Sequence, residues 1–179
     1  MLKILKLSVI AILLLQVGST GCSSDSGVDS SDDIEVKQLF WKNGNLKRER
    51  QLVDGMPVGL DKTYYENGQL FEETPHENGN VHGIQKNYRE DGTLSSETPW
   101  VNGTIEGLVK NYYPNGNLSY VLPYVNGDLN GIEKNYFLEG GLQAEIPRKN
   151  GKIDGVAKIY FKDGRLDKKV IYKNGIMKK

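Results

Sequence analysis

The sequence predicts an all-β fold, an open and curved antiparallel β-hairpin meander with about six repeats of 24 residues. Three observations lead to this prediction. Glycines recur at intervals of 24 residues without any insertion, and most of them follow Asn or Asp, as in tight hairpin turns. Apolar residues show no spacing near 3.6, which argues against amphipathic helices. Hydrophobic residues make up only 37% of the chain, which is little for a thick layered core.

Residues 1–21 have the pattern of a secretory signal peptide. Lys3 and Lys6 precede an apolar run, which ends in small residues directly before Cys22, the single cysteine of the chain. The end of this run resembles a bacterial lipobox, although Ser19 stands where that motif usually has leucine. The resemblance implies that Cys22 is acylated, with palmitate for example, and that the protein is anchored in the cell envelope, at the outer membrane if the host has two membranes. The alternative is an ordinary cleaved signal peptide with an incidental cysteine.

Residues 22–37 are predicted to be a disordered tether between this anchor and the folded part. Ser23–Asp33 contain five serines and four aspartates, a composition that cannot bury enough apolar surface to become ordered. In the whole chain 23 basic residues balance 23 acidic ones, so no overall charge favours nucleic acid. Membrane contact is therefore expected only through the N-terminal lipid.

Residues 38–179 are predicted to form the repeat domain, in which side chains recur in columns 24 residues apart. One glycine column begins at Gly44, a second begins at Gly59, and prolines from Pro75 to Pro147 form a third column. Lysine and tyrosine columns complete the unit: Lys62, Lys86, Lys110, Lys134 and Lys158, and Tyr64, Tyr88, Tyr112, Tyr136 and Tyr160.

Each repeat contains two turn dipeptides, which follow one another at alternating intervals of 11 and 13 residues, so each repeat is predicted to be one hairpin. Type I′ turns are expected at all of these sites, because Asn-Gly and Asp-Gly tolerate positive φ. The Gly59 column is the expected bulge of the longer strand, and the Pro75 column interrupts the ladder of the shorter strand. Every strand is therefore expected to bend or split near its middle.

Residue pairing across a hairpin follows from the position of its turn. A two-residue turn ending at Gly68 places Lys62 opposite Glu73 and Tyr64 opposite Phe71. An exposed lysine–glutamate pair of this kind contributes only about 0.2–1 kcal/mol, so its main effect is on register.

The two faces of the predicted sheet differ in character. One carries an aromatic–aliphatic stripe, which is the better core candidate and has Arg89 as its exception: Trp41, Tyr65, Tyr113, Phe137 and Phe161. The other face carries the tyrosine and lysine columns named above. Regularly spaced aromatic rings beside lysines can bind sugars, peptides or lipid head groups, so these columns are the candidate binding face. The alternative is structural, each tyrosine covering the sheet while its hydroxyl reaches water.

One copy of the unit reads NGNVHGIQKNYREDGTLSSETPWV, from Asn78 to Val101. It resembles the bacterial variant of the MORN repeat that occurs in YwqK-type antitoxin proteins. The resemblance covers most of the chain and implies an extended sheet of hairpins without catalytic residues or a cofactor, which contacts other proteins or membranes. It therefore implies a non-enzymatic, tethered protein that binds a protein partner in an antitoxin-like, immunity-like or adhesive role. A structural envelope spacer and a glycan-binding module are the alternatives.

A search for catalytic and metal-binding motifs also favours a protein without enzymatic activity. His76 and His82 occur in one repeat only, without a cysteine partner or the spacing of a zinc-binding helix, so no metal site is expected. The glycines form turns at a period of 24 and do not match phosphate-binding or nucleophile-elbow motifs.

Overall fold

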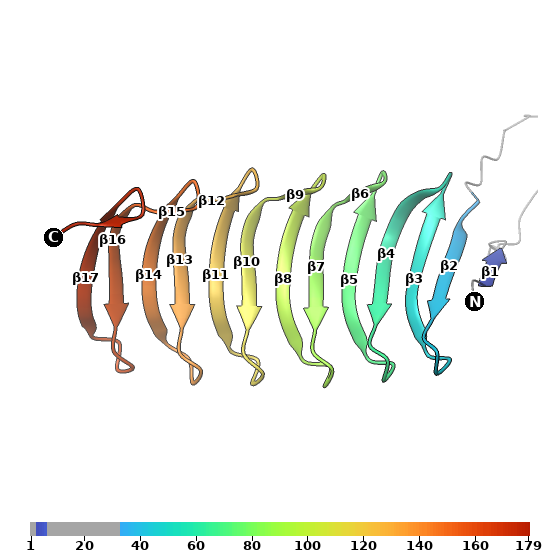
Figure 1. Ribbon diagram of the computed structural model, residues 1–179, viewed down its shortest axis with the longest axis horizontal. Helices are drawn as coiled ribbons and strands as arrows, with labels where there is room; N and C mark the ends of the chain where they lie inside the picture. Colours follow the sequence, from blue (N-terminus) through green and yellow to red (C-terminus); the bar gives the residue numbers. More distant parts are fainter. Residues whose placement is uncertain (1–2, 7–32) are drawn as a thin grey trace, which may run out of the picture.

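The computed structural model describes residues 3–6 and 33–179. Over these residues the chain forms one antiparallel sheet that is open at both ends and contains no helix, with the hairpins side by side in chain order (Figure 1). The predicted all-β hairpin meander is confirmed. Cys22, most of the predicted signal peptide and most of the tether lie outside the described residues.

The strands follow one another along the chain, and each hairpin pairs with the next. The short strand β1 (Lys3–Lys6) pairs with β2 (Glu35–Phe40). The next three strands are β3 (Leu46–Val53), β4 (Met56–Tyr64) and β5 (Leu70–Glu77). From there the longer strand is split into a piece of two residues and a piece of six: β6 (Asn80–Val81) with β7 (Gly83–Tyr88), β9 (Thr104–Ile105) with β10 (Gly107–Tyr112), β12 (Asp128–Leu129) with β13 (Gly131–Tyr136), and β15 (Lys152–Ile153) with β16 (Gly155–Tyr160). The remaining strands are β8 (Leu94–Val101), β11 (Leu118–Val125), β14 (Leu142–Lys149), β17 (Leu166–Lys173) and β18 (Ile176–Met177).

The repeat sheet starts at Glu35, three residues before the predicted boundary of the domain. Val36 and Lys37 pair with Gln51 and Arg50 of β3, so they extend the first hairpin back into the segment that was assigned to the tether.

The predicted turns fall into two classes. Six have both central residues at positive φ, as a type I′ turn requires, for example Asn102 at 48° and Gly103 at 78°. At the other six sites only glycine has positive φ. There, Gly116 N–H donates to Tyr113 O at 2.9 Å and Tyr113 N–H donates to Asn117 O at 2.8 Å. This is the pattern of a type I turn followed by a left-handed glycine, a three-residue loop, so the type I′ prediction is wrong for these six sites.

The three-residue loops change the register beside them. Lys62 lies opposite Glu73 as predicted, but Tyr64 lies opposite Leu70 and not Phe71, because a bulge follows Thr63. The type I′ turns have another effect, since four of the six donate a hydrogen bond to the preceding hairpin. Gly103 N–H donates to Val81 O at 2.8 Å, and Gly127, Gly151 and Gly175 donate in the same way to Ile105, Leu129 and Ile153.

The second glycine column and the proline column meet in space. A Cβ on Gly131, which has φ of +121°, would stand 3.0 Å from Cγ of Pro123, and Asn130 N–H donates to Pro123 O at 2.9 Å. The longer strand is split here, as predicted. The shorter strand β11 runs through Pro123 without a break, so it is not split there, although its ribbon is curved (Figure 1). A residue's N–H and C=O point to the same side of a strand, so the missing N–H of proline faces the bulge and no ladder bond is lost.

A single layer of strands leaves both faces partly open. We call the side that carries Leu60, Lys62, Tyr64 and their equivalents the regular face, and the side that carries Asp61, Thr74 and their equivalents the variable face. The buried hydrophobic residues of the described chain all lie on the variable face: Leu52, Val109, Ala144 and Ala157.

The aromatic stripe that was the better core candidate is not the core. Its members are half-buried, and Phe161 remains 48% exposed. The stripe lies next to the three-residue loops, and its side chains contact their own hairpin, as Tyr65 contacts Phe71, and the neighbouring hairpins.

Candidate functional site

Charged side chains form a row across the regular face, perpendicular to the strands. Register places glutamate and lysine alternately opposite one another from hairpin to hairpin. In order across the sheet, this charge row contains Glu49, Lys62, Glu73, Lys86, Glu97, Lys110, Val121, Lys134, Glu145, Lys158 and Lys169. Opposite charges in adjacent strands stabilise the register by a modest amount.

The predicted tyrosine and lysine columns hold this row together. Tyr112 donates its hydroxyl to Glu97 of the preceding hairpin at 2.8 Å, and Lys110 Nζ lies 3.5 Å from the same carboxylate. Tyr160 and Lys158 hold Glu145 in the same way, at 2.9 and 3.1 Å. The corresponding distance from Tyr88 to Glu73 is 3.0 Å. The hydroxyls therefore reach glutamate across the hairpin boundary and link adjacent repeats.

These contacts shift the ionisation of both partners. Burial of the ring, the hydrogen bond to Glu97 and the charge of Glu97 raise the pKa of Tyr112 to about 12. The hydrogen bond from Tyr160, followed by that from Lys158, lowers the pKa of Glu145 below its usual range. All ten predicted binding residues thus lie on the regular face, and the contacts of Tyr88, Tyr112 and Tyr160 support the structural interpretation of their column.

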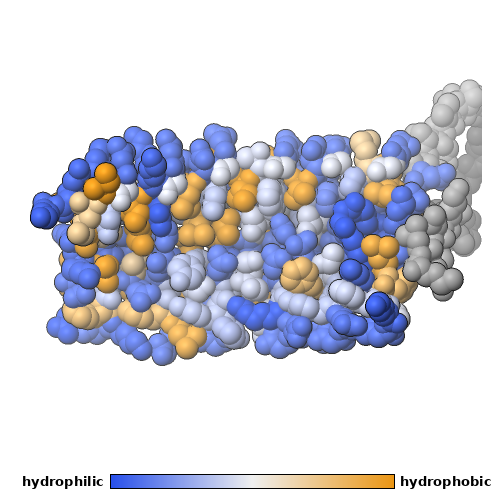
Figure 2. All heavy atoms as spheres, in the orientation of Figure 1, coloured by the Kyte–Doolittle hydropathy of each residue, from blue (hydrophilic) through white to orange (hydrophobic). Residues whose placement is uncertain are grey.

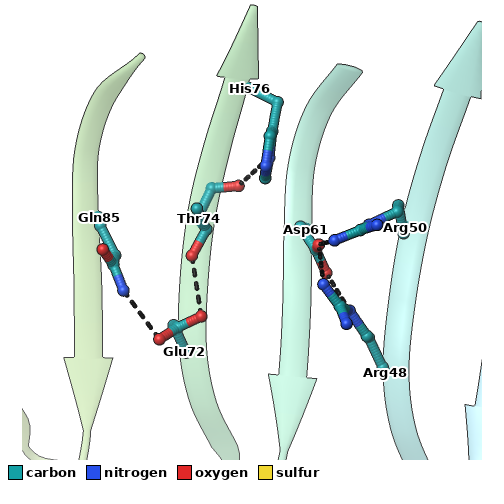
Figure 3. A network of polar contacts seen from close by, with 7 residues as sticks. All are labelled: Arg48, Arg50, Asp61, Glu72, Thr74, His76 and Gln85. Atoms are coloured by element: carbon teal, nitrogen blue, oxygen red, sulfur yellow. Dashed lines mark hydrogen bonds and ion pairs between the residues drawn. The ribbon is translucent and has the colours of Figure 1, made fainter. Parts of the chain in front are cut away.

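The N-terminal part of the variable face carries a network of polar contacts (Figure 3). Arg48 Nε and Arg50 Nε donate to the two oxygens of Asp61 at 2.9 and 2.7 Å, and the Asp61 side chain is only 5% exposed. Burial by itself raises the pKa of Asp61, but the hydrogen bonds and charges of the two arginines outweigh it, so the pKa lies below its usual value.

The same network continues over β5, β7 and β8. Thr74 Oγ1 and Gln85 Nε2 donate to Glu72 at 2.9 and 2.8 Å, and Trp100 Nε1 donates to Gln85 at 2.8 Å. Most polar groups of this part therefore bond to one another, and Thr63 Oγ1 is the buried exception without a hydrogen-bond partner.

The two histidines that were considered for a metal site have separate surroundings. His76 Nδ1 lies 3.1 Å from the carbonyl of Thr74, whereas His82 lies 3.2 Å from Asn102 and 3.8 Å from Glu77. Among the described residues, no group of three or more possible ligands is arranged to hold a metal ion.

The C-terminal part of the variable face contains one buried ion pair, Glu133 with Arg148, and an apolar hollow. Small side chains form its floor, because Ala157 and Ala144 occupy the columns that hold Asp61 and Glu72 in the N-terminal part. A hollow of about 320 Å³ lies above them, lined by Asn135, Gln143, Ala144, Ile146, Ile153, Ala157, Ile159, Val170 and Tyr172. Figure 2 shows hydrophobic side chains gathered over β11 to β14 on the side that it presents.

One set of contacts between repeats could not be foreseen as such from the sequence. The aromatic stripe with its arginine exception supplies hydrogen-bond donors: Trp41 Nε1 donates to the carbonyl of Tyr64 at 3.1 Å, and Tyr65 OH donates to that of Tyr88 at 2.9 Å. Arg89 stands in the same column and donates to the carbonyl of Tyr112, so it makes the contact that Tyr65 makes in the repeat before it. The sequence feature that could have indicated these contacts is that Trp, Tyr and Arg all carry a hydrogen-bond donor at the end of a long side chain.

The fold defines a protein made of stacked hairpin repeats, and the comparisons with known proteins identify the repeat. The family model described as "MORN repeat variant" matches five consecutive segments, residues 57–78, 81–102, 105–126, 129–150 and 153–174. Together these cover more than half of the chain, so the chain belongs to the MORN repeat variant family. Such repeats are modules that often take part in interactions with proteins or membranes.

No curated protein matches the chain. In the part of the chain that the structure describes, no helix is long and apolar enough to cross a membrane.

Proposed function

We propose that this chain is a non-enzymatic interaction protein that binds a protein partner through the variable face of its sheet. The observation that carries the proposal is the contrast between columns. The lysines and tyrosines of the regular face are the same in five repeats, and three of the tyrosines bond to the preceding hairpin, whereas the variable face changes from Asp61 to Ala157 along one column. Side chains that differ between otherwise equal units provide specificity without altering the scaffold.

The apolar hollow is the strongest candidate for the contact. It combines aliphatic side chains with the polar ends of Asn135, Gln143 and Tyr172 at its margin. Open apolar surface with polar groups at the rim is typical of protein interfaces. Asn135, Gln143 and Tyr172 would then orient a partner whose apolar side chain fills the hollow.

The experiment uses two neighbouring residues of β17 that point to opposite faces. Val170 lines the hollow, and Ile171 lies opposite Val156 on the regular face. The mature domain is used as bait for cell-envelope proteins, as wild type, Val170→Glu and Ile171→Glu. We expect Val170→Glu to lose a partner that the wild type and Ile171→Glu both retain. Equal retention by both variants, with equal thermal stability, would contradict binding at the hollow.

A structural envelope spacer is the second candidate function. The bonds from the type I′ turns to the preceding hairpin, such as Gly103 N–H to Val81 O, make each repeat a similar step in a long sheet. Deletion of one 24-residue unit distinguishes the candidates, because a spacer loses function gradually with length. A binding protein loses it only when the unit that contacts the partner is removed.

The cellular address is part of the same proposal. Lipidation of Cys22 would tether the sheet to the envelope, and an immunity-like role against an incoming effector or an adhesive role fits a protein held there. Mass spectrometry of the mature N-terminal peptide tests the anchor, since an acylated Cys22 is expected at its start. A peptide that begins elsewhere, or carries no fatty acid, would contradict it.

A further inference from the structure

The charge row of the regular face contains a repeated carboxylate site. Glu97 is held by Lys110 at 3.5 Å and by the hydroxyl of Tyr112 at 2.8 Å, and both of these side chains come from the next hairpin. Glu145 is held by Lys158 and Tyr160 in the same arrangement. The chain itself therefore shows how a Lys-x-Tyr pair on one strand binds a carboxylate on the strand before it.

In one hairpin the donors are present and the carboxylate is not. Val121 occupies the position that Glu97 and Glu145 occupy in the neighbouring repeats, and it lies opposite Lys110 on one side and Lys134 on the other. Tyr136 follows Lys134 at the spacing that Tyr112 and Tyr160 have from their lysines. Lys134 also faces Glu145, but that carboxylate is already bound by the Lys-x-Tyr pair of the next hairpin.

The position is open to solvent and has an apolar border. Leu108 and Ile132, which belong to the same face, are 52% and 47% exposed. A carboxylate that arrives from outside would therefore meet two ammonium groups and one hydroxyl beside an apolar surface. That combination fits an acidic side chain with its methylene groups better than a small free ion.

We propose that the gap at Val121 binds a carboxylate of an acidic side chain from a protein partner, held by Lys134 and Tyr136 and attracted by Lys110. The bound carboxylate takes the place that a glutamate of the chain takes in the adjacent repeats. This site is on the opposite face from the apolar hollow and does not depend on the function proposed above.

The test uses a substitution that places a carboxylate of the chain itself at the gap. The probe is a tetraglutamate peptide, which is titrated into the 15N-labelled mature domain at low salt while the amide signals of Val121, Lys134 and Tyr136 are followed. We expect Val121→Glu to weaken binding at least fivefold, because its own carboxylate occupies the site. Val121→Thr, which keeps the shape without the charge, is expected to stay within twofold of the wild type.

Two further variants separate a site from general attraction to lysines. Tyr136→Phe is expected to weaken binding, whereas Tyr112→Phe is not, since Glu97 already fills the equivalent place. Peptide shifts that spread evenly over Lys62, Lys86 and Lys158 and ignore Val121→Glu would overturn the proposal. Tighter binding of glucuronate than of tetraglutamate would overturn the assignment to an acidic side chain of a protein.

Discussion

The two faces of this sheet share the same strands but follow different rules. On the regular face, Lys110 and Tyr112 make the same contacts with the preceding hairpin that Lys158 and Tyr160 make, so one kind of bond joins hairpins at more than one place in the sheet. On the variable face, the column of Asp61 contains a buried ion pair in one repeat and alanine in another. The difference teaches that a single layer can keep uniform contacts between hairpins on one side and side chains that vary between repeats on the other.

The variable face itself has two parts. Its N-terminal part bonds most of its polar side chains to one another, among them Asp61, Glu72 and Gln85, whereas its C-terminal part leaves apolar side chains around a hollow. A surface whose polar groups already bond to one another offers less to a partner than one with open apolar area.

The largest loss of stability is expected when a glycine at one of the bulges is replaced. Gly131→Ala would place a Cβ 3.0 Å from Pro123 at a φ of +121°, so it should lower the free energy of unfolding by more than about 2 kcal/mol. Chemical denaturation measures this. Gly116→Ala is the matched control, because its Cβ would meet nothing within 4 Å and only the positive φ is strained, which costs about 1 kcal/mol. Equal losses would show that the contact with proline does not matter.

A smaller effect is expected on the variable face at the buried carboxylate. Asp61→Asn leaves Arg48 and Arg50 without their charged partner and should cost about 1 kcal/mol at neutral pH, since both arginines are partly screened by solvent. The pKa of Asp61 is lower in the folded state than in the unfolded state. Its stabilising effect is therefore present above pH about 4 and is lost as the pH falls through the folded pKa. Denaturation curves from pH 5 to 2 should fall less steeply for Asp61→Asn than for the wild type.

The regular face should be sensitive to alkaline pH. Tyr112→Phe removes the hydroxyl that bonds Glu97 and should cost about 0.5–1 kcal/mol. Because the folded state raises the pKa of Tyr112 to about 12, its stabilisation is present below pH about 10 and is lost as the pH rises through the folded value. The variant should therefore lose less stability than the wild type between pH 10 and 12. An identical loss in both proteins would exclude this tyrosine as a source of the alkaline transition.

The smallest expected effect is a gain in stability from one added hydrogen bond. Phe137 stands in the column where Tyr65 and Tyr113 donate to a carbonyl of the next repeat, so Phe137→Tyr should add a bond to the carbonyl of Tyr160. The expected stabilisation is about 0.5–1 kcal/mol in thermal or chemical denaturation. Phe161→Tyr is the control, because the described sheet offers its hydroxyl no carbonyl of a following hairpin, and it should leave stability unchanged.

The sequence predicts the period, the hairpins and the register of Lys62 with Glu73, because glycine columns and charge pairs are local signals. It does not reveal that half of the turns are three-residue loops. Pro114 argues against a two-residue turn at its site. A proline directly before Asn115 and Gly116 cannot supply the N–H that a two-residue hairpin turn needs at that position.

The buried positions were harder to predict, because in a single layer no side chain is enclosed from both sides. Ala144 and Ala157 are covered because they are small and their neighbours are large, and this depends on residues from several strands. The same limit applies to Arg89, whose role follows from a carbonyl 23 residues further along the chain.

The bond from four of the type I′ turns to the hairpin before each, such as Gly175 N–H to Ile153 O, spans 22 residues and no more. Under tension between the two ends, the terminal unit can therefore come away while the rest of the array stays intact. Each release would lengthen the chain by about 80 Å, the extended reach of 24 residues. A molecule fixed at one end and held by a partner at the other would therefore extend stepwise, one repeat at a time, and the repeats still folded would keep their structure.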